Sequence, residues 1–184
     1  MQDLKRCAWC NEKNEAYVKY HDEEWGILNL SDGYLYEMLI LESFQAGLSW
    51  ECVLNTRGHF RNAFDGFDVF KVCAYGEEKV AELLANDGII KNKLKIKAAI
   101  NNSKIFIETV KEFGSFASYL KRFTGETVIY EVGKTKNALS DAISDDLYKR
   151  GMRFVGSTII YSYLQAVGLI YSHEEGCFLH KTKE

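Results

Sequence analysis

A glutamate lies on the apolar face of a predicted helix that runs from about Asp32, its expected N-terminal cap, to Ala46. Five residues share that face by i, i+3 and i+4 spacing: Leu35, Met38, Leu39, Glu42 and Ala46. We expect this face to pack on the core, where an ionised carboxylate without a partner is very costly. Glu42 is therefore either paired with a cation or lines a cavity where a ligand meets it.

The residues that follow Glu42 add polar and aromatic groups to the same place. Gln45 lies one turn later on the same side of the helix, and Gly47 predicts a break. Ser49 is placed to cap a second helix that begins at Trp50. An acid, an amide and a large flat ring are thus brought together, which indicates a pocket for a planar polar molecule.

Composition limits the class of protein. Apolar residues make up 47% of the 184-residue chain and aromatic residues 14%, which is enough for one globular domain or two small lobes sharing a core. No run of 18 apolar residues occurs and no basic start precedes an apolar stretch, so we expect a cytoplasmic protein without a membrane span. The net charge of −3 requires any DNA-binding surface to be a local patch.

Helical periodicity covers most of the chain and predicts an all-α fold. We expect helices over residues 32–46, 50–64, 69–75, 77–85, 93–113, 116–122, 139–150 and 157–167. The aromatic-rich segment up to Gly26 shows no sustained helical period, so we interpret it as an irregular arm packed on the domain. Residues 124–136 are polar, and we expect an extended loop there.

Two glycines bracket a tight turn between the last two predicted helices. The turn, Gly151 to Gly156, has the form of the hairpin in a helix-hairpin-helix motif. Gly156 would let a phosphate approach the free N–H groups at the start of the second helix, where the helix dipole favours an anion. Arg153 adds positive charge, and Ser157 and Thr158 can donate hydrogen bonds. An ordinary turn between two helices is the alternative interpretation.

Cysteines and histidines near the two ends of the chain form a candidate metal site. Cys7 and His21 lie near the N-terminus, and His173 and Cys177 lie four residues apart near the C-terminus. Four such ligands can hold a structural zinc ion tetrahedrally and join the two ends. Because no compact zinc motif is present, unrelated thiols and a buried histidine remain the alternative.

Taken together, these motifs resemble the DNA-3-methyladenine glycosylase I family, a divergent branch of the helix-hairpin-helix glycosylases. The resemblance rests on residues 6–9, 17–26, 41–50, 87–90, 150–158 and 173–177, in the order of the family. It implies a single domain over residues 1–184, with two helical lobes sharing a base-binding cleft. It also implies a zinc ion held by Cys7, His21, His173 and Cys177, and double-stranded DNA with alkylated bases as the partner of a monomer.

The resemblance further implies roles for the pocket residues. A flipped-out 3-methyladenine carries positive charge, so Trp50 would stack on it with Trp9, Tyr17 or Tyr20. Glu42 would accept hydrogen bonds from the exocyclic amine, Tyr20 would present its hydroxyl to another edge, and Gln45 would line the same wall.

Water would then release the base and leave an abasic site. No lysine follows Gly156, where bifunctional superfamily members place their nucleophile, so we expect no lyase activity.

Gly151, Arg153, Gly156, Ser157 and Thr158 would bind the DNA backbone. Two other functions remain open from the sequence. The chain could be a non-catalytic helix-hairpin-helix DNA-binding module, or a zinc-stabilised protein adaptor whose basic hairpin is only solvated.

Overall fold

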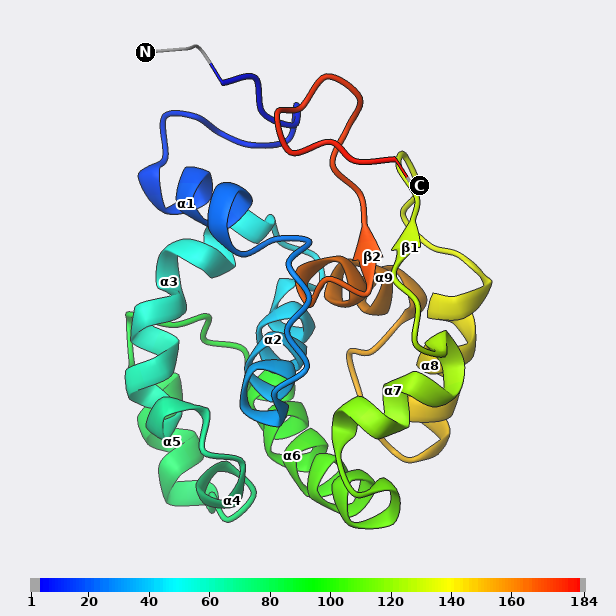
Figure 1. Ribbon diagram of the computed structural model, residues 1–184. Coiled ribbons are helices and arrows are strands. Elements are labelled where there is room, and N and C mark those ends of the chain that lie inside the picture. Colours follow the sequence, from blue (N-terminus) through cyan, green and yellow to red (C-terminus); the bar gives the residue numbers. More distant parts are fainter. Residues whose placement is uncertain (1–3, 183–184) are drawn as a thin grey trace.

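The computed structural model describes residues 4–182, and these residues are mostly helical (Figure 1). The elements in chain order are α1 (Glu15–Glu23), α2 (Asp32–Gln45), α3 (Trp50–Ala63), the 3₁₀ helix η1 (Asp65–Phe67), α4 (Val69–Val72), α5 (Glu77–Ala85), α6 (Lys93–Phe113), α7 (Phe116–Thr124), β1 (Ile129–Tyr130), α8 (Ala138–Lys149), α9 (Ser157–Ala166) and β2 (Ile170–Tyr171). The predictions for 77–85 and 93–113 are confirmed to the residue. No helix in this part of the chain is long and apolar enough to cross a membrane.

Helix α2 lies at the centre of the molecule and packs against α3, α6, α7 and α9 (Figure 1). Its burial extends beyond the predicted stripe, because Tyr36, Ile40, Leu41 and Phe44 are also almost completely buried. The expectation of one apolar face was therefore too narrow. A helix enclosed by four others has no solvent-facing side over most of its length.

The N-terminal cap of α2 also differs from the prediction. Asp32 was expected to be the cap, but the cap position is Ser31 and Asp32 is the first helical residue. The carboxylate of Asp32 accepts hydrogen bonds from the backbone N–H groups of Phe116 and Ala117. It therefore satisfies two backbone N–H groups that the first turn of α7 would leave open. The contact also joins α2 to α7 across 84 residues of sequence.

The prediction of an irregular N-terminal arm was wrong for residues 15–23, which form α1. Asn14 caps this helix by accepting from the N–H groups of Ala16 and Tyr17. The buried residues Tyr17, Tyr20 and His21 follow an i, i+3, i+4 pattern. The aromatic and histidine character of this stripe conceals it from a search for aliphatic periodicity.

A short parallel pairing joins two segments that are far apart in sequence. β1 pairs with β2 through Ile129 with Ile170 and Tyr130 with Tyr171. The expected extended loop at 124–136 is thus tied at its middle to the segment that follows α9. This pairing fixes residues 132–135 beside the C-terminal end of α9.

The turn after α9 fixes the segment that leads into α2. Gly168 has a φ of +78°, and a Cβ there would lie 2.3 Å from the backbone nitrogen of Leu28. Only glycine fits so close an approach. The backbone N–H of Gly26 donates to the carbonyl of Gln165, and that of Asn29 donates to the carbonyl of Val167. The segment between α1 and α2 is therefore held against the end of α9.

Candidate functional site

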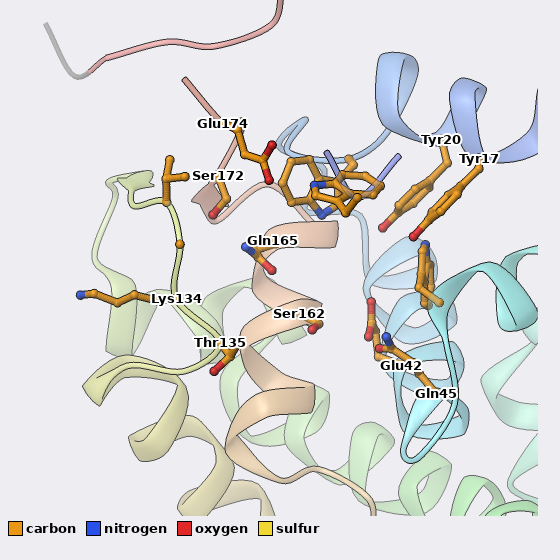
Figure 2. Close-up of a pocket in the computed structure, with 15 residues that line it drawn as sticks. Tyr17, Tyr20, Glu42, Gln45, Lys134, Thr135, Ser162, Gln165, Ser172 and Glu174 are labelled. Atoms are coloured by element: carbon orange, nitrogen blue, oxygen red, sulfur yellow. The ribbon is translucent and has the colours of Figure 1, made fainter. Parts of the chain in front are cut away.

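A cavity of about 380 Å³ opens between α1, α2, α9 and the loop at residues 132–135 (Figure 2). Its lining residues are Trp9, Tyr17, Tyr20, Trp25, Glu42, Gln45, Trp50, Val132, Gly133, Lys134, Thr135, Ser162, Gln165, Ser172 and Glu174. The six residues that the sequence predicted as catalytic or substrate-binding all line this cavity. The structure thus brings them together, and their individual roles remain predictions.

Three buried polar atoms of the cavity have no hydrogen-bond partner within residues 4–182. They are Glu42 Oε2, Gln45 Oε1 and Trp50 Nε1. Glu42 and Gln45 come from the last turn of α2, and Ser49 caps α3 so that Trp50 is its first residue. Buried polar groups in folded proteins are nearly always satisfied. Two acceptors and one donor left open in one cavity indicate a polar ligand.

Burial shifts the protonation equilibrium of Glu42 toward the neutral acid. The residue is 2% exposed, and burial raises its pKa well above the ordinary glutamate value. No charged side chain within residues 4–182 offsets this shift. A ligand that is cationic, or that donates hydrogen bonds to the carboxylate, would favour the ionised form again.

Aromatic rings enclose the cavity on the side of α1. The ring centroids of Tyr20 and Trp50 are 5.3 Å apart, and those of Trp9 and Tyr17 are 5.4 Å apart. Burial raises the pKa of Tyr20 well above its ordinary value, with a further contribution from the charge of Glu42. The Tyr20 hydroxyl therefore stays protonated and available as a donor.

The wall opposite Glu42 was not predicted from the sequence. Figure 2 shows Ser162 and Gln165 projecting from α9 across the cavity from Glu42 and Gln45 on α2. Ser162 and Gln165 are three residues apart among the aliphatic and aromatic residues 159–166, and this polar pair was the available signal. Residues 132–135 carried no local signal, because the β1–β2 pairing brings them to the cavity.

The four predicted metal ligands converge in one buried cluster. The candidate donor atoms of Cys7, His21, His173 and Cys177 lie within 4.8 Å of one another. His173 Nδ1 lies 3.6 Å from the Sγ atoms of both cysteines, and His21 Nε2 lies 3.6 Å from Cys177 Sγ. A tetrahedral zinc ion with its usual Zn–S and Zn–N bonds gives an S···N edge of about 3.5 Å. The donor set therefore fits a four-coordinate metal.

The second nitrogen of each histidine has a partner that orients the ring. His21 Nδ1 donates to Asp22 Oδ1 at 2.7 Å, and His173 Nε2 donates to the carbonyl of Trp25 at 3.2 Å. Such outer contacts orient the other nitrogen of each ring toward the cluster, where it could bind a metal. The rings of Trp25 and His173 also lie 4.7 Å apart, so this cluster directly adjoins the aromatic wall of the cavity.

The hairpin at residues 151–156 lies outside the cavity. Arg153 is exposed, and its guanidinium stacks 4.8 Å from the ring centroid of Tyr148. Gly156 precedes α9 without a side-chain cap, and Thr158 is exposed. The hydroxyl of Ser157 instead contacts Ser140 and Asp141. The backbone N–H groups at the uncapped start of α9, rather than the Ser157 side chain, are therefore free to receive an anion.

Comparisons with known proteins match most of the length of this chain. A family model described as methyladenine glycosylase matches residues 9–180. DNA-3-methyladenine glycosylase 1 of Escherichia coli (strain K12) is 40% identical over 181 residues, which cover 95% of this chain and 96% of that protein. DNA-3-methyladenine glycosylase of Haemophilus influenzae (strain ATCC 51907 / DSM 11121 / KW20 / Rd) is 33% identical, covering 94% and 96%.

Solved structures agree with these sequence matches. A crystal structure of 3-methyladenine DNA glycosylase I superposes with a TM-score of 0.92 at 39% identity, covering 96% of this chain and all of that one. A structure from Staphylococcus aureus, described as the basis of 3-methyladenine recognition by that enzyme, has a TM-score of 0.92 at 25% identity. It covers 98% of this chain and 99% of that one.

The raised pKa of Glu42 predicts a pH-dependent gain in stability for Glu42→Gln. Below the ordinary glutamate pKa, the folded and unfolded chains are both protonated at residue 42. As the pH rises, the unfolded chain ionises first, so the wild type loses about 1.4 kcal/mol for each pH unit until folded Glu42 ionises. Glu42→Gln has no carboxyl group at this position, so its free energy of unfolding does not fall with pH in this way.

Urea unfolding at pH 4.5 and pH 7.5 measures the effect. We expect the free energy of unfolding of Glu42→Gln, relative to wild type, to be higher at pH 7.5 than at pH 4.5. Glu23→Gln, at an exposed position on α1, is the control and should show no such change. A relative stability that is equal at the two pH values would contradict the assignment of a buried, unpaired carboxyl group.

Proposed function

The chain belongs to the methyladenine glycosylase family, and we propose that it excises 3-methyladenine from alkylated double-stranded DNA. The observation that carries this proposal is the group of open polar atoms on Glu42, Gln45 and Trp50 inside an aromatic cavity. The enzyme flips the damaged nucleotide out of the duplex and hydrolyses its N-glycosidic bond. The products are free 3-methyladenine and an abasic site.

The cavity groups complement the chemistry of the lesion. The exocyclic amine of the base donates to the carboxylate of Glu42 and the amide oxygen of Gln45. The indole N–H of Trp50 and the hydroxyl of Tyr20 donate to ring nitrogens. Trp9 and Tyr17 complete the aromatic wall against which a cationic ring is stabilised.

Charge selects the damaged base over normal adenine. The methyl group at N3 makes the attached base cationic, and that charge favours the ionised form of Glu42. The same charge weakens the glycosidic bond, whose electron pair leaves with the base as the neutral molecule. Water adds to the sugar carbon and releases its proton to solvent. Adenine itself has neither the charge nor the weakened bond.

The cavity offers no free amine for a lyase reaction. Lys134 contributes to the cavity wall, but its ammonium group pairs with Glu131 and points away from the centre of the cavity (Figure 2). The Lys134 amine is therefore not placed to attack the sugar of a nucleotide in the cavity. This arrangement supports a monofunctional hydrolase.

Excision and its dependence on two cavity residues test the proposal. On duplex DNA treated with a methylating agent, the wild type should release 3-methyladenine, measured by chromatography of free bases. Glu42→Gln and Trp50→Ala should each lower the single-turnover rate about tenfold or more, because each loses a contact to the cationic base. Cys52→Ser, at an exposed position on α3, should excise at the native rate.

Release of no 3-methyladenine above a protein-free reaction would refute the enzyme and favour a non-catalytic DNA-binding module. A native rate for Glu42→Gln would refute the role of that carboxylate alone.

The hairpin at residues 151–156 serves as the DNA backbone contact, in the manner of a helix-hairpin-helix motif. The uncapped start of α9 at Gly156 and the exposed charge of Arg153 support this part of the proposal. The N–H groups of Ser157 and Thr158, in the uncapped first turn of α9, would donate to a DNA phosphate. Gly151 allows the sharp turn with its φ of +103°.

Loss of the Arg153 charge should weaken duplex binding without regard to sequence. In Arg153→Ala, we expect the slope of log affinity against log salt to fall by about one. Fluorescence anisotropy with a labelled duplex at several salt concentrations gives the slope. Lys111→Ala, at an exposed position in the last turn of α6, is the control. An unchanged slope in Arg153→Ala would place the phosphate contact elsewhere.

A structural zinc ion held by Cys7, His21, His173 and Cys177 is the final part of the proposal. The fit of the four donors to a tetrahedral ion supports it, as do the oriented histidine rings. The ion would join the first and last segments of the chain and so hold α1 against the cavity. It would take no part in the chemistry, because all four positions around it are filled by protein.

Metal analysis of freshly purified protein should find about one zinc ion per chain. Cys177→Ala should lose the ion and lower the melting temperature, because a buried cluster then lacks its central charge. Cys73→Ala, outside the cluster, should keep the zinc ion and the native melting temperature. Metal-free protein with undiminished stability would refute the zinc site.

A further inference from the structure

Helix α6 connects the hairpin with the base cavity. At the hairpin, the Asn101 side chain donates to the carbonyl of Gly151 at 2.9 Å. Asn102 is fully buried and makes two contacts with Arg153, donating to its carbonyl and accepting from its N–H, each at 2.9 Å. The backbone of the hairpin is therefore fixed to the middle of α6.

At the other end of this connection, Lys95 contacts the helix that carries Glu42. Lys95 lies two turns before Asn102, so both residues point from the same side of α6. Its ammonium group donates to the carbonyls of Phe44 and Ala46, at 2.7 and 2.5 Å. These carbonyls belong to the end of α2, immediately beside Gln45.

A lysine is an unusual choice for this position. Lys95 is only 7% exposed, and burial lowers the pKa of its ammonium group. No carboxylate among the described residues pairs with it. Its hydrogen bonds go to backbone carbonyls that the end of α2 leaves unsatisfied, where a positive charge also complements the helix dipole. Its Nζ also lies 5.9 Å from the ring centroid of Phe154 in the hairpin.

Lys95 therefore contacts both functional regions through one group. On one side are the last turn of α2, with Glu42 and Gln45, and the connection to Trp50. On the other side is Phe154, in the turn whose backbone Asn101 and Asn102 hold. A misplacement of a reacting group by about 1 Å can cost two orders of magnitude in rate. The relative placement of hairpin and cavity decides whether a flipped base reaches Glu42 while the backbone stays bound.

We propose that Lys95 is a positioning residue for base excision, which holds the end of α2 at a fixed place relative to the DNA-bound hairpin. This inference rests on the proposed excision of 3-methyladenine. Lys95 touches neither the base nor DNA in this account. It acts through the backbone at Phe44 and Ala46, and thereby through the placement of Glu42, Gln45 and Trp50.

Single-turnover excision at saturating methylated duplex separates positioning from folding. In Lys95→Met, which keeps the length of the side chain and loses the charge, we expect a rate constant about tenfold lower. The duplex affinity should stay within about threefold of wild type, and the reaction amplitude should stay native. Lys95→Arg, which can donate to both carbonyls, should recover most of the rate. Lys111→Met, on the same helix, should match wild type.

A merely structural role gives a different result, because partial unfolding lowers the amplitude and leaves the rate constant of the folded molecules native. That result, or a rate lost in proportion to duplex affinity, would overturn the inference. If Lys95→Met does not fold, Asn101→Ala loosens the hairpin end of the same connection. It should lower the rate constant about threefold at native amplitude, and a native rate constant there would equally overturn the inference. Absence of excision by wild type would instead refute the proposed function.

Discussion

The burial of Glu42 without a protein partner is the constraint on which the rest of the site depends. Burial raises the pKa of this carboxyl group, so its ionisation at neutral pH opposes folding. The surrounding elements nevertheless bury it at the wall of the cavity, on the central helix α2. A cationic ligand in the cavity can supply both the missing hydrogen bonds and the compensating charge. The cavity is therefore organised for a cationic planar base, and the free energy lost in folding becomes selectivity in binding.

The first and last segments of the chain complete the cavity around that carboxyl group, and they are held together by contacts that are long-range in sequence. Glu174 accepts a hydrogen bond from the N–H of Ala8, and Phe178 donates its N–H to the carbonyl of Lys5. The cysteine and histidine cluster lies between these contacts, and its His173 packs on Trp25 of the aromatic wall. The rings on α1 thus face Glu42 because the two ends of the chain meet behind them.

Spacing patterns within a few residues correctly predicted the features that depend on neighbouring residues alone. The bounds of α5 and α6, the Ser49 cap of α3 and the conflict at Glu42 all follow from spacing within a few residues. The predictions that depended on long-range contacts were incomplete. Asp32 accepts from the first N–H groups of α7 rather than capping its own helix, and residues 132–135 reach the cavity through the pairing of β1 with β2. Nothing within either segment indicates its distant partner.

The protonation of Glu42 is the most direct test of the account, and carbon-detected NMR of the labelled carboxyl group measures it. In the free protein, the carboxyl pKa should lie well above the ordinary glutamate value, because burial is uncompensated. Addition of free 3-methyladenine should lower that pKa, since the exocyclic amine then donates to the carboxylate. An ordinary pKa that does not move when the base is added would contradict the account.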